Sequence, residues 1–242
     1  MKSGEEPLIG IITIDGPAGA GKSTVARELS GALSRELKVK YEYIDTGAMY
    51  RAATLYAMRN EINFRISETL DFLPDVLNID VVDGEVYLDG ESISGVVRTD
   101  EITLNTKYVA SNYLIRRFMV KLQQNFAEKF IRLKKGVVTE GRDQGTLAFP
   151  NADCKFFLTA SRDERARRRY LDLAAMGVSE EDIDLDQIWE DIGRRDMRDR
   201  TRKYGGLKKA EDAIEFCTDN KDVEEVVIQL KYIYKEIMKN RI

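Results

Sequence analysis

One stretch near the start of the chain combines residue types that bind phosphate groups. The sequence GPAGAGKST, from Gly16 to Thr24, fits the pattern G-x-x-x-x-G-K-[ST] and directly follows an apolar run. Glycines in such a loop turn backbone N–H groups toward a polyphosphate, and the helix that follows adds the positive end of its dipole. A glycine-rich turn matches this pattern by chance in only about 1% of chains of this length. The pattern predicts a nucleoside triphosphate site with Mg²⁺, formed by Gly16, Pro17, Ala18, Gly19, Ala20, Gly21, Lys22, Ser23 and Thr24.

Two side chains of this loop have distinct expected roles. The Lys22 ammonium is mobile and is expected to neutralise the β- and γ-phosphates. The Ser23 hydroxyl is the expected ligand of Mg²⁺. The loop alone does not indicate which molecule receives the phosphate.

A second group of polar residues follows another short apolar run. Residues 41–44 lead into Asp45 and Thr46, and Arg51 comes shortly afterwards. We expect Thr46 and Arg51 to hold an anion at the start of a helix, where backbone N–H groups are unpaired. Asp45 is expected to bind Mg²⁺, directly or by orienting a bound water. For Arg51 the alternative is an ordinary arginine on the surface of a helix.

Arginines are crowded between residues 162 and 202, in two clusters that an acidic stretch at 180–186 separates. Most of them are expected to form ion pairs on solvated helices. Arg195, Asp199 and Arg202, however, are spaced four and three residues apart and therefore share one helix face. A shared face can contact a single ligand. We therefore expect this region to form a helical lid whose arginines close over phosphates.

Strands and helices alternate around these residues. The expected strands are Ile9–Ile14, Tyr41–Ile44, Val137–Thr139, Lys155–Leu158 and Ala213–Phe216, and the expected helices are Lys22–Leu37, Ala48–Arg59, one from Ser161 and Val223–Lys239. This order predicts an α/β three-layer sandwich with a central parallel sheet. Ligands of such sheets bind at the carboxyl ends of the strands, where Glu140-Gly141-Arg142-Asp143 follows the third strand.

One segment interrupts the alternation. Residues 77–98 alternate apolar and polar side chains, with turn signals at Asp83-Gly84 and Asp89-Gly90, which predicts a small antiparallel meander. A long helical region is expected from Glu101 to Lys134. We therefore expect a core of residues 1–60 and 135–242, with the lid at about 162–196. An insertion of residues 61–134 would contain the meander at about 79–98.

The composition excludes several kinds of chemistry. The 242 residues include no histidine and no CxxC pair, which argues against histidine general bases, Ser-His-Asp triads and zinc sites. Cys154 and Cys217 are expected to act as small apolar residues in or near strands. A formal net charge of −4 argues against a protein that coats nucleic acid. No signal peptide or membrane span is indicated, so we expect a cytoplasmic protein without membrane partners.

Five separated motifs follow one another along nearly the whole chain. They are DGPAGAGKST at 15–24, YIDTGAMYRA at 43–52, GESISGVVRT at 90–99, EGRDQGTLAFPNA at 140–152 and RRDMRDRTR at 194–202. A phosphate-binding loop alone is shared by many enzymes, whereas the five motifs in this order are specific. Together they resemble the bacterial cytidylate kinases, in the nucleoside monophosphate kinase group.

This resemblance implies transfer of the γ-phosphoryl group of ATP to CMP or dCMP, with Mg²⁺, by a monomer. The insertion would be the nucleoside-monophosphate-binding region. By the same resemblance, the acceptor phosphate would be held by Thr46, Arg51, Arg142 and Arg202, the sugar by Arg195 and Asp199, and the cytosine by Arg116 and Asp143. The residues that would act on the transferred group are Lys22, Arg142, Arg165, Arg169 and Arg195, with Arg165 and Arg169 reaching ATP from the lid.

The sequence departs from the family pattern near the positions that would contact the base. Lys107 replaces a serine that helps to read cytosine, Tyr113 a usual proline, and Gln124 the arginine of a Gln-Arg pair. Gly206 replaces the proline of a Pro-Leu pair after the lid. A kinase for another nucleoside monophosphate, such as UMP, or for a small phosphate acceptor therefore stays open as an alternative. A nucleotide-dependent switch protein is a further alternative, although Asn220-Lys221-Asp222 lacks the spacing of a guanine-reading N-K-x-D sequence.

Overall fold

A central parallel sheet organises the molecule, as the computed structural model of residues 8–93, 95–96 and 99–241 describes it. Its strands are β1 (Ile11–Asp15), β2 (Tyr41–Asp45), β6 (Gly136–Gly141), β7 (Cys154–Thr159) and β8 (Ile214–Cys217). They lie in the order β2-β6-β1-β7-β8, and every neighbouring pair is parallel. Strands β1 and β6 are adjacent and parallel, so the polar loops that follow their carboxyl ends lie side by side.

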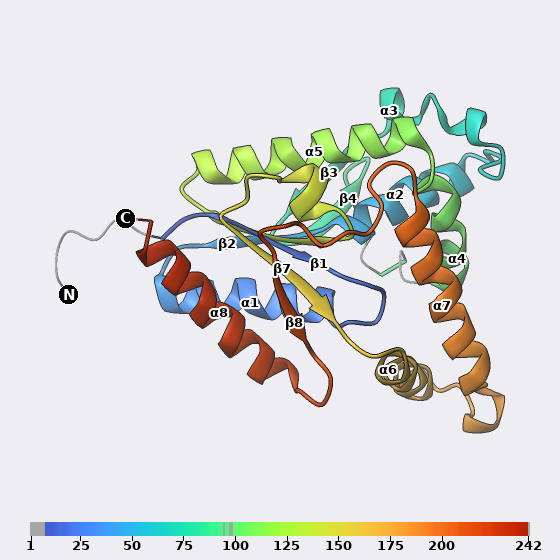
Figure 1. Ribbon diagram of the computed structural model, residues 1–242. Coiled ribbons are helices and arrows are strands. Elements are labelled where there is room, and N and C mark those ends of the chain that lie inside the picture. Colours follow the sequence, from blue (N-terminus) through green and yellow to red (C-terminus); the bar gives the residue numbers. More distant parts are fainter. Residues whose placement is uncertain (1–7, 94, 97–98, 242) are drawn as a thin grey trace.

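Helices cover both faces of this sheet (Figure 1). On one face lie α1 (Lys22–Leu37) and α8 (Val223–Lys239), which pack through a buried cluster that includes Leu29, Leu33 and Leu230. The other face carries α2 (Thr46–Arg59) and α5 (Tyr113–Arg132), whose buried side chains form a second cluster with the insertion. The expected α/β three-layer sandwich is therefore confirmed.

The expected small antiparallel sheet is present. It consists of β3 (Ile79–Val82), β4 (Glu85–Leu88) and β5 (Glu91–Ser92), in that order. Preceding it are a 3-10 turn, η1 (Ser67–Leu70), and the short helix α3 (Leu73–Val76). The end of the expected meander and of the GESISGVVRT motif, at residues 94 and 97–98, lies outside the described residues. The apolar side chains of β3 and β4 alternate inward, where they join the core under α2.

The long helical region expected from Glu101 to Lys134 consists of two helices, α4 (Asp100–Val109) and α5. Asn112 separates them because its side chain accepts a hydrogen bond from the backbone N–H of Ile115 at 2.9 Å and so caps α5. The same amide donates to Asp71 Oδ1 at 2.8 Å, which ties the start of α5 to the segment after η1. This capping asparagine sets the start of the helix that carries Arg116.

Two arginine-rich helices lie beyond the carboxyl ends of the strands (Figure 1). They are α6 (Arg162–Ala175) and α7 (Leu185–Thr201), with a 3-10 turn, η3 (Glu180–Asp182), between them. Trp189 joins the two helices: its ring lies 3.2 Å from the Arg162 guanidinium carbon, and its Nε1 donates to Asp163 Oδ1 at 2.8 Å. The action of these helices as a mobile lid stays a prediction. The expected division of the chain into a core and an insertion stays a prediction as well.

Two smaller expectations concern the cysteines and the membrane. Cys154 is buried in β7 as expected, whereas Cys217 lies in β8 but is exposed, so it does not serve as a core side chain. Over the part of the chain that the structure describes, no helix combines the length and the apolar character of a membrane span.

The start of β6 provides a test of core packing. A Cβ atom at Gly136 would overlap the ring of Tyr41, and that ring is fixed by hydrogen bonds of its hydroxyl with Leu8 O at 2.8 Å and Tyr234 Oη at 2.7 Å. We expect Gly136→Ala to lower the free energy of unfolding by about 1–3 kcal/mol, measured by urea denaturation. Gly95→Ala is the control, because an added Cβ there meets open space. Equal stability of the two variants would contradict this packing.

Candidate functional site

The predicted phosphate-binding loop lies between β1 and α1. Gly21 precedes α1 with φ +82°, a left-handed conformation that glycine adopts without strain. The Lys22 ammonium is buried and donates to Pro17 O at 2.7 Å, so it is folded over the loop. Thr24, in the first turn of α1, is exposed. The loop therefore holds a buried cation against its own backbone.

The electrostatic surroundings of Lys22 link this loop to the arginines. Burial, together with the positive charges of Arg142 and Arg195, lowers the pKa of Lys22 to about 7. The negative charges of Glu140 and Asp199 raise the pKa of Lys22 and so partly offset this effect. Residues far apart in the sequence thus share one electrostatic field, which extends from the loop to α7.

Glu140 is a site residue for which the sequence suggested no role. It lies in β6 beside Asp45 of β2, and its carboxylate accepts a hydrogen bond from Ser23 Oγ at 2.8 Å. The Asp45 carboxylate instead caps α2, since it accepts from Ala48 N at 2.8 Å, and it lies 3.5 Å from Arg51 Nη2. The position of Glu140 at the carboxyl end of a buried central strand is the signal that could have identified it.

The arrangement of Ser23 and Glu140 fits Mg²⁺. Two hard oxygen atoms lie together beside the phosphate-binding loop, and Mg²⁺ in phosphoryl-transfer sites uses one or two protein oxygens with waters and substrate phosphates. No group of three or more acidic or cysteine side chains that could hold a metal ion occurs among the described residues. The chain thus offers a partial ligand set, which a polyphosphate would complete.

Asp199 lies between two of the arginines predicted to bind the acceptor. Its carboxylate oxygens lie 2.7 Å from Arg142 Nε and 2.8 Å from Arg202 Nη2. Burial disfavours the charged forms of both Arg142 and Asp199. Their mutual attraction outweighs burial, so the pKa of Arg142 is raised and the pKa of Asp199 is lowered. Arg195, one turn earlier on α7, has its pKa lowered to about 10 by desolvation and by Arg142, and it stays charged at neutral pH. Two or more guanidinium groups therefore converge around one carboxylate.

Thr46 and Arg51 lie at the start of α2, beside the end of β6. The Thr46 hydroxyl donates to Glu140 O at 2.7 Å, which fixes α2 against that strand. Arg51 Nε is buried and has no hydrogen-bond partner among the described residues. A buried donor without a partner is costly unless a ligand satisfies it. This donor therefore indicates an anion or another acceptor at the predicted second site.

Arg116 and Asp143 form a buried ion pair at 2.5 Å. Arg116 Nε is also buried without a hydrogen-bond partner in the described part of the chain. The Arg116 guanidinium lies 5.3 Å from the centre of the Tyr50 ring, and burial raises the pKa of that phenol. Tyr50 belongs to the YIDTGAMYRA motif, but nothing in its spacing predicts a position beside Arg116. A planar ring beside a charged pair is suited to a nucleobase.

A buried carboxylate positions the loop that carries Arg142 and Asp143. Asp15, at the end of β1, accepts from Gln144 N at 2.9 Å and from Gly145 N at 2.7 Å. These are the first residues of η2 (Gln144–Ala148), a short π-helical turn. Burial raises the pKa of Asp15 to about 7, while the two backbone hydrogen bonds oppose that change. Asp15 thereby connects the phosphate-binding loop to the second site.

The lid arginines occupy two different places. Arg165 is buried against the phosphate-binding loop, where its Nη1 donates to Ala18 O at 3.2 Å. The same guanidinium pairs with Asp196 of α7 at 2.8 Å. Arg169 lies one turn later on α6 and is half-buried. The structure thus brings Arg165 against the phosphate-binding loop, whereas Asp199 and Arg202 of the next arginine-rich segment lie together with Arg142.

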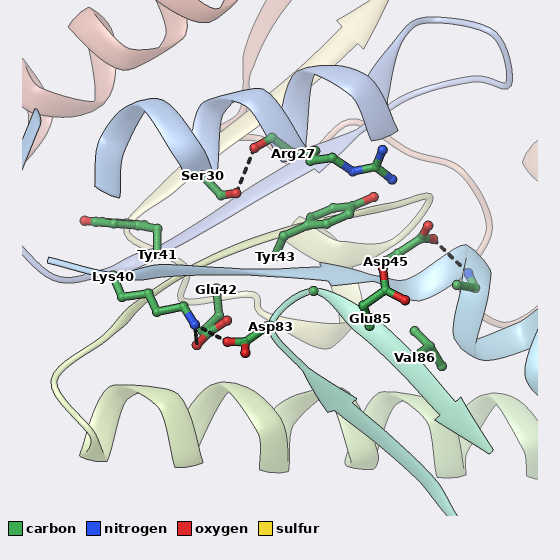
Figure 2. Close-up of a pocket in the computed structure, with 12 residues that line it drawn as sticks. Arg27, Ser30, Lys40, Tyr41, Glu42, Tyr43, Asp45, Asp83, Glu85 and Val86 are labelled. Carbon is green, nitrogen blue, oxygen red and sulfur yellow. Dashed lines mark hydrogen bonds and ion pairs between the residues drawn. The ribbon is translucent and has the colours of Figure 1, made fainter. Parts of the chain in front are cut away.

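A cleft of about 480 Å³ opens beside the site, between α1, β2 and the turn from β3 to β4 (Figure 2). Lys40 bridges Glu42 of β2 and Asp83 of that turn, which fastens the insertion to the core. Arg27 and Tyr43 extend along the cleft toward Asp45 (Figure 2). Asp45 is the predicted site residue among its lining, so the cleft adjoins the site at one edge.

Comparisons with known proteins agree with this geometry. A model of the family described as cytidylate kinase matches residues 12–236. The cytidylate kinase of Caldicellulosiruptor bescii is 39% identical over 237 residues, which cover 96% of this chain and 98% of that protein. The cytidylate kinase of Bacillus cereus is 42% identical over 226 residues, which cover 92% and 94% of the two chains. This chain therefore belongs to the cytidylate kinase family.

Proposed function

We propose that this protein transfers the γ-phosphoryl group of ATP to the phosphate of CMP or dCMP, giving ADP and CDP or dCDP. One observation carries the proposal: the charges of Arg142 and Asp199 act on Lys22 of the phosphate-binding loop, and Asp199 pairs with both Arg142 and Arg202. A site for one triphosphate alone would not need the second set of guanidinium groups. Because the reaction acts on free nucleotides, the cytoplasm is its expected location.

The donor is proposed to bind along Gly16 to Thr24, with Lys22 on its β- and γ-phosphates. Arg165, held over Ala18, would bind the donor phosphates from the lid, together with Arg169. Ser23 and Glu140 would hold Mg²⁺, and Asp45 would reach it through a water. When bound, Mg²⁺ neutralises charge on the β- and γ-phosphate oxygens.

The acceptor is proposed to bind on the other side of Lys22. Thr46, Arg51, Arg142 and Arg202 would hold its phosphate, and Arg195 and Asp199 its sugar. The buried Nε of Arg51 would donate to a phosphate oxygen. Arg116 and Asp143 would contact the base beside the Tyr50 ring. Arginine suits this task because its fork of donors matches two phosphate oxygens at once.

The chemistry requires positioning rather than proton transfer. An oxygen of the acceptor phosphate attacks the γ-phosphorus of ATP, and the bond to the β-phosphate oxygen breaks as ADP leaves. The attacking oxygen is already ionised at neutral pH, so no general base is needed. The charge on the transferred group is neutralised by Lys22, Arg142 and Arg195, together with the lid arginines. The absence of histidine is consistent with this mechanism.

Initial rates with ATP, Mg²⁺ and a set of acceptors test the proposed function. We expect CMP and dCMP to give the highest kcat/KM, with UMP, AMP and GMP lower, because the Arg116–Asp143 pair offers fixed donors and acceptors to one base edge. ATP turnover without an acceptor should be slow. If UMP or a purine monophosphate is the better acceptor, cytosine specificity is wrong. Turnover independent of any acceptor would contradict the kinase assignment.

The lowered pKa of Lys22 predicts that ATP binding takes up a proton. Above pH 7 the Lys22 side chain of the ligand-free protein is largely the neutral amine. Bound phosphates favour the charged ammonium form and so raise the pKa of Lys22. At pH 8 we expect uptake of roughly half a proton or more per ATP, and ATP affinity that falls as the pH rises above about 7. Calorimetry in buffers of different ionisation enthalpy measures the uptake.

The matched control for this measurement is Lys22→Arg. A guanidinium keeps its charge across this range, so its ATP binding should take up no proton and should vary little between pH 7 and 9. Proton uptake of the same size in this variant would assign it to another group. An absence of uptake in the unaltered protein would show that Lys22 is already charged before ATP binds.

A further inference from the structure

The proposed base-contacting pair is covered by a glycine. Gly205, with φ +65°, follows α7, and its carbonyl accepts from Arg116 Nη2 at 3.3 Å. A Cβ atom at this position would overlap both Asp143 Oδ2 and Arg116 Nη2. Only a residue without a side chain can therefore lie so close to the pair. The backbone at Gly205 therefore lies directly against the Arg116–Asp143 pair.

This short segment is anchored at both ends. Before Gly205, Arg202 pairs with Asp199, and its Nη1 donates to Gly205 O at 3.4 Å. After it, the buried Leu207 donates its backbone N–H to Asp199 O at 2.7 Å. Between these anchors the chain contains two consecutive glycines, whose backbone has more conformational freedom than any other dipeptide. The hydrogen bonds to Gly205 O are long, at 3.3 and 3.4 Å, so a further contact would restrict the position of Gly205 more tightly.

Tyr204 makes that contact. Its ring lies 5.0 Å from the ring of Tyr113, at an interplanar angle of 77°. Tyr113 is the first residue of α5, one turn before Arg116. The guanidinium of Arg117 lies 5.6 Å from the centre of the Tyr113 ring. The edge-to-face pair thus joins the loop after α7 to the helix that carries Arg116. Edge-to-face aromatic pairs are favourable beyond the area they bury.

We propose that Tyr113 and Tyr204 form a latch that holds Gly205 over the Arg116–Asp143 pair and so positions the wall of the acceptor-base site. The inference rests on the proposed function, because it takes that pair to contact the acceptor's base. The latch lies between the insertion and the segment after α7. Its two tyrosines are positioning residues: they act through Gly205.

Two variants and their combination test the latch. Tyr113→Ala and Tyr204→Ala should each raise KM for CMP about three- to tenfold, with KM for ATP and kcat little changed, as expected for the loss of one aromatic pair. The double variant should be no worse than the more affected single variant, because both changes remove the same contact. Tyr204→Phe should behave as the unaltered protein, since the ring is retained. Tyr232→Ala is the control for removing an exposed tyrosine on α8.

A second readout does not depend on activity. Lys203 is exposed and adjoins the latch, so trypsin can report how often residues 203–206 leave their place. Without ligand, cleavage after Lys203 should be faster in both alanine variants than in Tyr204→Phe and Tyr232→Ala.

The outcomes separate the two proposals. Cleavage at the unaltered rate in the alanine variants would overturn the latch, and faster cleavage with unchanged KM for CMP would overturn its role in the base site. If the unaltered protein does not prefer CMP or dCMP, the proposed function fails, while the cleavage rates still decide whether the latch exists.

Discussion

The Asp199 carboxylate holds together groups that otherwise repel one another. Arg142 and Arg202 both contact it, and the positive charges of Arg142 and Arg195 also act on Lys22. Asp199 pairs directly with two of these guanidinium groups, and Glu140 and Asp15 add negative charge near Arg142. A bound phosphate would add the negative charge that the cluster lacks. The charge balance of the site is therefore suited to an acceptor that brings its own anion.

The parallel sheet allows the two proposed phosphate sites to lie close together. The carboxyl ends of β1 and β6 are neighbours, so the phosphate-binding loop proposed for the donor and the segment Glu140–Asp143 start side by side. Asp15 fixes that segment through the backbone of Gln144 and Gly145. Helices α2, α5 and α7 then bring one or more arginines each to the same edge. The second site is assembled from four separate parts of the chain around one strand end.

Local patterns predicted the elements better than the contacts between them. Helices Lys22–Leu37 and Val223–Lys239 were predicted at their observed bounds, because apolar spacing marks both of them locally and Asp222 caps the second. The division of the region 101–134 was missed, since the cap at Asn112 depends partly on a contact with Asp71. The contact of Glu140 with Ser23 joins residues 117 positions apart and leaves no trace in local spacing. The motifs predicted which residues form the site, whereas contacts between distant parts of the chain, such as that of Glu140 with Ser23, required the sheet.

The central claim is that this protein contains a preformed site for the acceptor's phosphate, separate from the triphosphate loop. Calorimetric titration of the ligand-free protein with CMP and with cytidine tests it most directly, because the two ligands differ only in that phosphate. Two or more charged hydrogen bonds to the phosphate predict that CMP binds at least about 100-fold more tightly than cytidine. Affinities within a few-fold of each other would contradict the claim.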